Sequence, residues 1–404
     1  NFINNKSKKE KVMINREQCG QFIDANTDNM VKDWKRLVEI ETGSFDKEGL
    51  EEAAGTLKAM FEGIGFRCDL IDTGAAGKTL TGILGREREG KPILFSGHYD
   101  TVFPKGTLAD NPFRIENGRA YGPGVLDMKG GIIIAYYVIK ALNSLGFTER
   151  PIKILFAGDE EIAHENSTTA ETLVEEAKNC EFAFNMETGL TDGSLCVGRK
   201  GGITISAEVT GVEAHAGNSF ETGRNAIEEM AYKICRLREI TNLSEGITVS
   251  VGTIKGGTVS NSIPGSCRIE IDARFIKPSQ MEKLEHDLYA ALDETHIPGT
   301  QTTYKVLSII NAFETTNSVK KLFDFCSQAL QDCGEEPLKS TVLGGNSDAA
   351  YINIAGTPVI CSCGVIGQGN HTGKEFAIVA TMAERAKMLL SILSRLDSYK
   401  GEAE

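Results

Sequence analysis

The sequence predicts an α/β protein of two domains, in which a small βαββαβ domain is inserted into a larger domain. Three observations lead to this prediction. At 404 residues, the chain exceeds the roughly 250–300 residues over which a single hydrophobic core usually extends. Apolar, strand-like runs alternate with amphipathic helical patterns in the first half of the chain and again near its end. Between residues 199 and 312, a different order of strands and helices replaces that alternation.

The larger domain is assigned to residues 13–198 and 313–404, with Met13 expected to be the native start and residues 1–12 left out of the prediction. Its first part is predicted to contain helices over 16–40, 48–64 and 129–145 and strands over 67–72, 79–85, 92–98 and 151–158. Its second part is predicted to contain a helix over 316–333, a strand over 357–363 and a helix over 376–396. This alternation indicates a sheet with helices on both faces.

The inserted domain is assigned to residues 199–312. The pattern predicts strands over 201–210, 247–254, 267–275 and 302–310, with helices over 222–239 and 278–294. In chain order these elements read βαββαβ, which is the ferredoxin-like arrangement.

The charge and composition of the chain limit the kinds of partner that the protein can bind and predict where in the cell it is located. A formal net charge of −13 argues against nucleic acid or an anionic membrane surface as a partner. No stretch reaches the roughly 18–20 apolar residues of a membrane span, and the polar, basic N-terminus lacks the apolar core of a secretory signal. The ten cysteines are scattered without a C-x-x-C pair, so we expect them to be reduced and mostly buried in a cytoplasmic protein.

Six histidines occur in the chain, and two of them lie in segments that suit metal binding. His98 ends a predicted strand in S-G-H-Y-D-T-V-F, and Asp100 shares its side of the extended backbone. Zinc accepts imidazole nitrogen, and a carboxylate such as Asp100 can fix the tautomer of a ligating imidazole. His371 lies in a glycine-rich turn, G-Q-G-N-H-T-G-K-E, after the last strand. Alone, H-x-D is more typical of a surface histidine.

Acidic residues also follow predicted strands or precede a helix. Asp127 starts the long apolar helix in Y-G-P-G-V-L-D-M-K-G-G, where helix capping would explain it equally well. Glu160 and Glu161 follow a buried strand in L-F-A-G-D-E-E, and Glu187 ends the next strand in F-A-F-N-M-E-T-G. A solvated loop is the alternative for the adjacent acids. Taken together, acids and histidines gather at the carboxyl ends of successive strands, where ligands bind in open α/β sheets.

The set of segments resembles the family of two-zinc peptidases that contains the aminoacylases and the bacterial, folate-cleaving glutamate carboxypeptidases. The resemblance runs from about residue 30 to the C-terminus and is carried by H-Y-D-T-V-F, Y-G-P-G, D-E-E, T-V-S-N-S-I-P and S-D-A-A-Y, in family order. It implies a mixed-sheet zinc-peptidase catalytic domain with an inserted domain that serves as lid and dimerisation surface.

The resemblance also implies a role for each candidate residue. Asp127 would bridge two Zn²⁺ ions per chain, with His98 and Glu187 completing one site and Glu161 and His371 the other. Co²⁺ and Mn²⁺ can use the same ligands. Asp100 would orient His98, and Glu160 would be the general base that takes a proton from water and gives it to the leaving amine. The peptide bond between Asp127 and Met128 would be cis.

In the inserted domain, the resemblance makes His215 of V-E-A-H-A-G an oxyanion donor that reaches the active site of a partner chain in a homodimer. Asn261 and Arg274 would hold the carboxylate of the substrate. From the residues alone, a lid-surface histidine, a turn residue and a strand-surface charge explain these three as well. Gly344 and Gly345 precede a probable helix whose N–H groups could bind an anion. Three further histidines, at 164, 286 and 296, are predicted to have no role.

These expectations favour a hydrolase of an amide bond next to a free carboxylate, which would act on a small peptide and release a C-terminal amino acid such as glutamate. An N-acyl-amino-acid deacylase that removes acetyl or succinyl groups is the nearest alternative. A catalytically silent binding protein is less favoured because every catalytic position matches the family pattern. A nucleotide-binding protein is disfavoured because the glycine-rich segments lack G-x-x-x-x-G-K-[ST].

Overall fold

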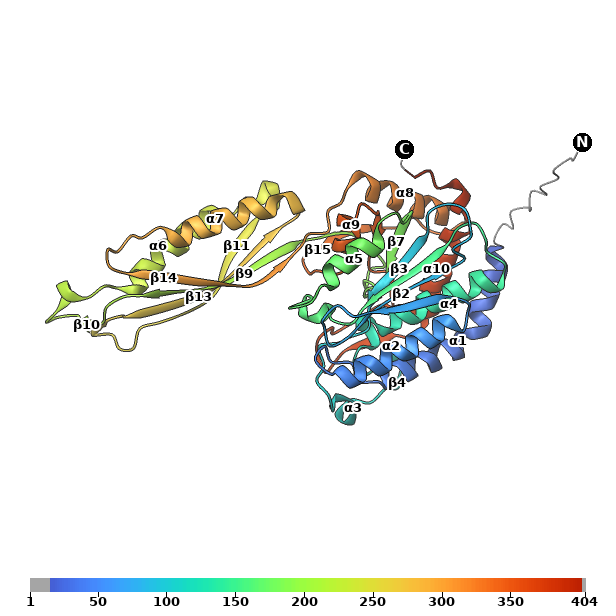
Figure 1. Ribbon diagram of the computed structural model, residues 1–404, viewed down its shortest axis with the longest axis horizontal. Helices are drawn as coiled ribbons and strands as arrows, with labels where there is room; N and C mark the ends of the chain where they lie inside the picture. The colour runs from blue at the N-terminus through green and yellow to red at the C-terminus, as the bar shows by residue number, and fades with distance from the viewer. Residues whose placement is uncertain (1–14, 402–404) are drawn as a thin grey trace, which may run out of the picture. The chain divides into compact units, whose positions relative to one another are not determined.

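The computed structural model describes residues 15–401, so Met13 lies outside the described residues. The chain divides into two compact units. The first contains the chain up to Val197, Thr315–Thr341 and the residues from Ser347 onward. The second contains Gly198–Glu314 together with Val342–Asn346, and runs from green through yellow to orange in Figure 1. Each unit has its own sheet and hydrophobic core.

The first unit is built on a six-stranded sheet, of which β2, β3 and β7 are labelled in Figure 1. In spatial order its strands are β1 (Arg67–Ile71), β2 (Thr79–Leu84), β6 (Ile152–Ala157), β3 (Ile93–His98), β7 (Phe182–Asn185) and β16 (Val359–Ile360). The last four run parallel, whereas β2 pairs antiparallel with both β6 and β1. The sheet is therefore mixed, and the predicted fold class is confirmed.

Helices cover both faces of this sheet. They are α1 (Arg16–Val38), α2 (Lys47–Glu62), α4 (Gly130–Ser144), α5 (Thr169–Ala177), α8 (Asn317–Gln331), α9 (Ala349–Ile354) and α10 (Ala380–Leu393). In β6, the ring of Phe156 lies 5.7 Å from that of Phe61 on α2, whereas Lys153 Nζ lies 2.8 Å from a carboxylate oxygen of Glu176 on α5. Because residues three apart in a strand point to opposite faces, α2 and α5 cover opposite sides. Every residue of β3, in the middle of the sheet, is accordingly buried.

Smaller elements complete the first unit. The strands β17 (Gly367–Gln368), β18 (Phe376–Ile378), β5 (Arg119–Tyr121) and β4 (Arg114–Glu116) form a second sheet in that order. A short helix α3 (Thr107–Asp110) follows β3. Two strands at the unit boundaries, β8 (Leu195–Arg199) and β15 (Ser340–Leu343), pair with each other. Within residues 15–401, no helix combines the length and the apolar character needed to cross a bilayer.

The second unit has an antiparallel sheet with the order β11 (Thr248–Gly256), β13 (Ser266–Phe275), β9 (Gly201–Thr210) and β14 (Gln301–Ile310). Helices α6 (Ala226–Glu239) and α7 (Met281–Asp293) pack on the sheet, and in chain order the elements read βαββαβ. Burial alternates along β13, as expected for a sheet with one covered face. The hairpin-like pair β10 (Ala214–His215) and β12 (Ser262–Ile263) extends from this unit.

Several predicted boundaries were wrong, and three of the differences have a clear local reason. The helix predicted over 222–239 begins at Ala226, because the side chain of Asn225 accepts the first free backbone N–H groups. The helix predicted over 376–396 begins at Ala380, because β18 pairs with β5 just before it. The strand predicted over 357–363 shrinks to β16, and Ser362 has a positive φ of 64° that an extended strand does not allow.

Candidate metal centre

The imidazole of His98 lies buried at the carboxyl end of β3 and is surrounded by acids. Its Nδ1 atom is 3.2 Å from an oxygen of Asp100, as expected for a carboxylate that orients the ring. Its Nε2 atom is 3.2 Å from Asp127 Oδ1, 3.4 Å from Glu187 Oε1 and 3.8 Å from Glu160 Oε2. The parallel strands β3, β6 and β7 end at one edge of the sheet, which brings these residues together.

The carboxylate of Asp127 lies between the two candidate histidine ligands. While Oδ1 faces His98, Oδ2 lies 3.2 Å from Nε2 of His371, which also lies 3.1 Å from Glu161 Oε2. Asp127 is in the irregular turn before α4, and its peptide bond to Met128 is cis, as the family resemblance implied. One carboxylate with an oxygen toward each imidazole has the arrangement that a bridging ligand requires.

The electrostatics of the cluster show how tightly its charges interact. Burial alone would lower the pKa of His98, but the charge of Glu160 and hydrogen bonds to three further carboxylates outweigh burial and raise that pKa well above its usual range. Burial alone would raise the pKa of Asp127, but hydrogen bonds with His371 and His98 hold it far below normal. Hydrogen bonds to Asp127 and Glu161 raise the pKa of His371 to about 11. The cluster therefore stabilises positive charge strongly.

The donor set fits divalent metal ions. Two groups of ligand atoms converge within 4.8 Å, one from His98, Asp127 and Glu161 and the other from His98, Glu160 and Glu187. Glu161 Oε1 is buried without a hydrogen-bond partner among residues 15–401, and such an atom needs a cation or donor to offset its desolvation. Imidazole nitrogen and carboxylate oxygen are ligands that zinc accepts.

Glu160 differs from the other acids in its surroundings. Its Oε2 atom is the most distant of the carboxylate oxygens around His98 Nε2. Burial raises the pKa of Glu160 well above its usual range, the charge of His98 opposes this, and repulsion by Glu187 and Asp348 adds to it. A carboxyl group that holds a proton more readily than usual suits general acid–base chemistry near neutral pH.

Asp100 also fixes the segment that carries the two glutamates. Its Oδ1 and Oδ2 atoms accept the backbone N–H groups of Glu160 and Glu161, each at 3.1 Å, and Ser44 donates its hydroxyl to Oδ2 at 2.7 Å. One buried carboxylate thus holds the 160–161 turn in register with His98. We expect its loss to misplace both glutamates as well as the histidine.

Two further residues contact Asp127, and sequence reasoning missed both. Asn370 donates from Nδ2 to Asp127 Oδ2 at 2.8 Å. The buried carboxylate of Glu375 accepts the backbone N–H groups of Gly124, Leu126 and Asp127 at 2.7–3.2 Å. Burial raises the pKa of Glu375 to about 8 despite these bonds. Both residues lie close to His371 in the segment G-N-H-T-G-K-E, and this position was the sequence feature that could have identified them.

The prediction that His164 has no role was wrong. Its ring is buried between two acids, with Nδ1 3.0 Å from Asp159 Oδ1 and Nε2 2.8 Å from Asp348 Oδ1. Burial opposes protonation, but the charge of Asp348 and hydrogen bonds to both acids raise the pKa of His164 to about 11. A neutral imidazole has only one N–H, so only the protonated ring can donate to both carboxylates. The protonated His164 ring therefore links the turn over residues 159–164 to Asp348, which directly precedes α9.

Replacement of His164 by Gln is expected to destabilise the protein by about 3–5 kcal/mol at pH 7, because it leaves buried carboxylates unpaired. Since the pKa is raised on folding, the stability that His164 contributes is complete below its ordinary pKa of about 6.5 and is lost as pH rises through about 11. Urea unfolding of chelator-treated protein at pH 7 and pH 10 should therefore show a smaller difference between variant and wild type at pH 10. His286→Gln, at a side chain that is 80% exposed, is the control. Equal stability of the two variants would contradict this role.

Two of the candidate residues of the second unit, His215 and Asn261, lie close together, because β10 pairs with β12 and the N–H of Ala216 donates to the carbonyl of Asn261 at 2.9 Å, whereas Arg274 is on β13. His215 is exposed on β10, and its Nδ1 atom accepts the N–H groups of Gly217 and Asn218 at 3.1 and 3.0 Å. The neutral ring therefore carries its proton on Nε2 and can donate outward. Asn261 is exposed in the turn before β12. Arg274 on β13 donates to both oxygens of Asp272, at 2.8 and 2.6 Å, so a substrate carboxylate would have to compete with Asp272.

The predicted anion site at Gly344 and Gly345 gains little support from its surroundings. Both glycines belong to the segment that groups with the second unit, and the carbonyl of Gly345 accepts a hydrogen bond of 3.3 Å from Arg199. The helix that follows, α9, has only six residues. Its small dipole makes a weak anion site.

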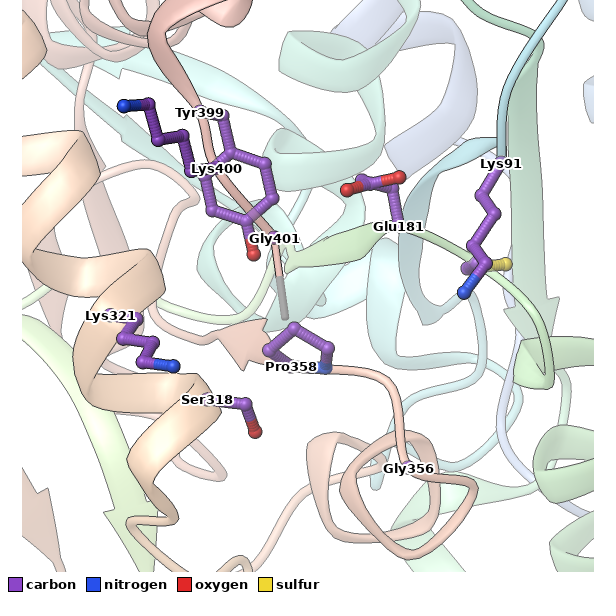
Figure 2. Close-up of a pocket in the computed structure, with 10 residues that line it drawn as sticks. Lys91, Glu181, Ser318, Lys321, Gly356, Pro358, Tyr399, Lys400 and Gly401 are labelled. Atoms are coloured by element: carbon purple, nitrogen blue, oxygen red, sulfur yellow. The ribbon is translucent and has the colours of Figure 1, made fainter. Parts of the chain in front are cut away.

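Two cavities in the first unit lie at different ends of the sheet. A cavity of about 530 Å³ opens beside Glu161 and is lined by Gly43–Asp46, Thr101–Lys105 and Ile162. A cavity of about 120 Å³, shown in Figure 2, is lined by Lys91, Glu181, Lys321 and Tyr399 among others. Lys91 and Glu181 precede β3 and β7, so this second cavity lies at the amino ends of the parallel strands, away from the candidate ligands. Of these two cavities, the one beside Glu161 is the one that adjoins the candidate metal centre.

Comparisons with known proteins agree with this geometry. The sequence model of Peptidase family M20/M25/M40 matches residues 94–395. Carboxypeptidase G2 of Pseudomonas sp. (strain RS-16) is 31% identical over 376 residues, which are 92% of this chain and 90% of that protein. Succinyl-diaminopimelate desuccinylase 2 of Ruegeria sp. (strain TM1040) is 28% identical over 346 residues, or 80% and 85% of the two chains. The crystal structure of aminopeptidase PepT from Bacillus cereus ATCC 10987 has a TM-score of 0.76 at 22% identity, covering 96% of this chain and 100% of that one.

Proposed function

The chain belongs to peptidase family M20/M25/M40, whose members are metal-dependent hydrolases, and from this premise we propose that it is a two-zinc, carboxypeptidase-like amidohydrolase. The proposed reaction cuts an amide bond next to a free carboxylate and releases a C-terminal amino acid such as glutamate. The observation that carries the proposal is Asp127, whose two oxygens face the imidazoles of His98 and His371. Glu187 lies on the side of His98, and Glu161 on that of His371.

In this proposal, each residue of the metal centre has a defined task. His98, Asp127 and Glu187 would hold one ion, and Asp127, Glu161 and His371 would hold the other. Bound Zn²⁺ lowers the pKa of water and polarises a carbonyl group; Co²⁺ or Mn²⁺ can do the same at these ligands. Glu160, which lies close to the ligands without being needed as one, takes the proton from the attacking water. The same carboxyl group then gives a proton to the leaving amine nitrogen.

The second unit supplies the recognition of substrate and of the transition state in this proposal. Arg274 has the planar fork that binds a carboxylate through two hydrogen bonds, and the carboxylate of the substrate would replace Asp272, which occupies that fork in the structure. His215 donates from Nε2 to the oxyanion, because its Nδ1 atom is already occupied by two backbone N–H groups. Asn261 assists with the carboxylate.

A panel of substrates tests the activity and separates the proposal from its runner-up. We expect the zinc-loaded protein to hydrolyse N-acyl-glutamates faster than dipeptides, and faster than N-acyl derivatives of neutral amino acids. The alternative, a deacylase of acetyl or succinyl groups, is favoured by the similarity to a desuccinylase. It predicts that the rate depends on the acyl group and little on the amino acid. Hydrolysis of dipeptides alone would contradict both.

We propose that the second unit also joins two copies of the chain. The edge strand β11 carries exposed residues over most of its length, and such an edge can pair with its copy across a two-fold axis. Each His215 would then act in the active site of the other chain. A single oxyanion donor is worth roughly 10²–10³-fold in turnover.

Complementation tests this arrangement. Glu160→Gln chains and His215→Ala chains should each be inactive, and mixing them should restore activity because one site of each mixed dimer has both wild-type groups. The measurement is the turnover of the mixture after subunit exchange has been verified by mass. Exchange without recovery of activity would show that His215 acts within its own chain or has no catalytic part. A fully active monomer would exclude the dimer.

A further inference from the structure

A lysine that the proposed mechanism does not use lies two residues from the bridging carboxylate. Lys129 ends the irregular turn that contains Asp127 and directly precedes α4. Within the described residues, Lys129 and Lys233 are the two buried lysines, and the side chain of Lys129 is only 1% exposed. Lysine is almost never fully buried unless its amine is paired. The surroundings of this amine therefore indicate what the side chain does.

The Lys129 amine holds the segment that follows α1. Its Nζ atom donates to the carbonyl of Ile40 at 2.7 Å. This segment is in turn bound to the residues just after β3. The N–H of Thr101 donates to the carbonyl of Thr42 at 2.8 Å, and the N–H of Ser44 donates to the carbonyl of Thr101 at 3.2 Å. The start of α4 is thus connected to the end of β3 through the segment over residues 40–44.

These contacts close a ring that begins and ends at Asp127. The hydroxyl of Ser44 donates to Asp100 Oδ2 at 2.7 Å, and an oxygen of Asp100 lies 3.2 Å from Nδ1 of His98. The other ring nitrogen of His98 lies 3.2 Å from Asp127, and the backbone leads from there back to Lys129. Removal of the amine opens this ring but leaves every proposed ligand in the chain.

Three supporting carboxylates also surround the amine. Burial lowers the pKa of Lys129 to about 7, and the charges of Glu375, Asp100 and Glu41 oppose this lowering. Each of the three acids accepts backbone N–H groups from a different segment, which are, in the same order, residues 124–127, 160–161 and 106–108. The Lys129 amine is therefore a basic group that three carboxylates with separate supporting contacts have in common.

We propose that Lys129 is a positioning residue for the metal centre, whose amine fixes the Asp127 turn relative to Asp100 and His98 and thereby sets how tightly and in what geometry metal is bound. The proposal rests on the proposed function, because it requires the two-metal centre. In it, Lys129 touches neither metal nor substrate. Groups that orient metal ligands typically change metal affinity by about 10–100-fold when they are lost. A purely structural lysine would change the stability of the protein and leave metal binding as it is.

Lys129→Met tests this role, with Lys233→Met as the matched control. Lys233 is also fully buried, and its Nζ atom donates to the carbonyls of Leu292 and Glu294 at 2.6 and 2.5 Å, but it lies in the second unit. The measurements are the affinity for Zn²⁺, by competition with a chromophoric chelator, and the visible spectrum of the Co²⁺-loaded protein. Lys129→Met should weaken Zn²⁺ binding by about 10–100-fold and alter the cobalt spectrum, whereas Lys233→Met should change neither.

Each outcome decides the proposal. Wild-type affinity and spectrum in Lys129→Met that is folded by circular dichroism would overturn it and leave the proposed function in place, and so would an equal loss of affinity in Lys233→Met. If the wild type binds no metal, the proposed function is wrong and the positioning role with it. If Lys129→Met does not fold, Lys129→Gln, which keeps an N–H donor of shorter reach, is expected to show the weakened affinity. Failure of both variants to fold would overturn the proposal, because the amine would then serve the fold as a whole.

Discussion

Glu160→Gln is expected to lower kcat by about 10²–10⁴-fold while the metal content of the protein stays the same. The amide of Gln has nearly the shape of the carboxyl group but cannot take a proton from water. In the wild-type protein, Oε2 of Glu160 is the surrounding carboxylate oxygen that lies farthest from Nε2 of His98, at 3.8 Å. The positions of the proposed metal ligands should therefore survive the change. Steady-state turnover and elemental analysis of the same samples are the two measurements.

A neighbouring acid provides the control for Glu160. Glu165 lies in the same turn but is exposed, and Glu165→Gln should keep both turnover and metal. Glu161→Ala should behave differently from Glu160→Gln, because it is expected to lose an ion. Near-native turnover of Glu160→Gln would show that another group is the base.

Asp127→Ala is expected to abolish measurable turnover and to reduce the metal content from two ions per chain to at most one. Among the carboxylates of residues 15–401, only that of Asp127 pairs with both imidazoles, so its removal takes a ligand from each proposed site at once. The ring nitrogens of the two histidines would still be available to bind metal, but the carboxylate that orients both rings would be missing. Elemental analysis after dialysis against metal-free buffer, with kcat measured on the same preparation, tests this expectation.

The control for Asp127 is an acid with no place in the cluster. Asp110, at the end of α3, is exposed, and Asp110→Ala should bind as much metal as the wild type. Two ions per chain in Asp127→Ala would refute the bridging role. A single ion in the wild-type protein would refute the two-metal arrangement as a whole.

Most of the first unit could be predicted from the sequence because its strands and helices are long and strongly patterned. The buried run of β3 and the apolar helix α4 both lie within a residue or so of their predicted bounds. The predicted start of the final helix was wrong because β18 is a strand only through its pairing with β5, more than 250 residues earlier in the chain. Such a partner leaves no trace in the local pattern of residues.

The same distinction holds within the candidate site. The residues predicted as ligands could be recognised because they lie in segments that resemble those of a known peptidase family, and because they gather where predicted strands end or a helix begins. Glu375 and His164 could not, because their function depends on contacts with residues 248–251 and 184 positions away in the chain. An acid that accepts backbone N–H groups has no preferred neighbours in sequence. Long-range polar contacts of this kind are therefore the contacts that a sequence predicts least well.

The discontinuity of the first unit has a consequence for biosynthesis. On the ribosome, the Gly198–Glu314 segment of the second unit is made before one of the five proposed ligands, His371, and before Asn370 and Glu375, which contact the Asp127 turn. This segment is nearly the whole of a compact unit and can fold during synthesis. The nascent first unit, in contrast, can present His98, Glu161 and Glu187 but cannot hold the Asp127 turn in place. The proposed metal centre can therefore be completed only after the last segment of the chain has been made.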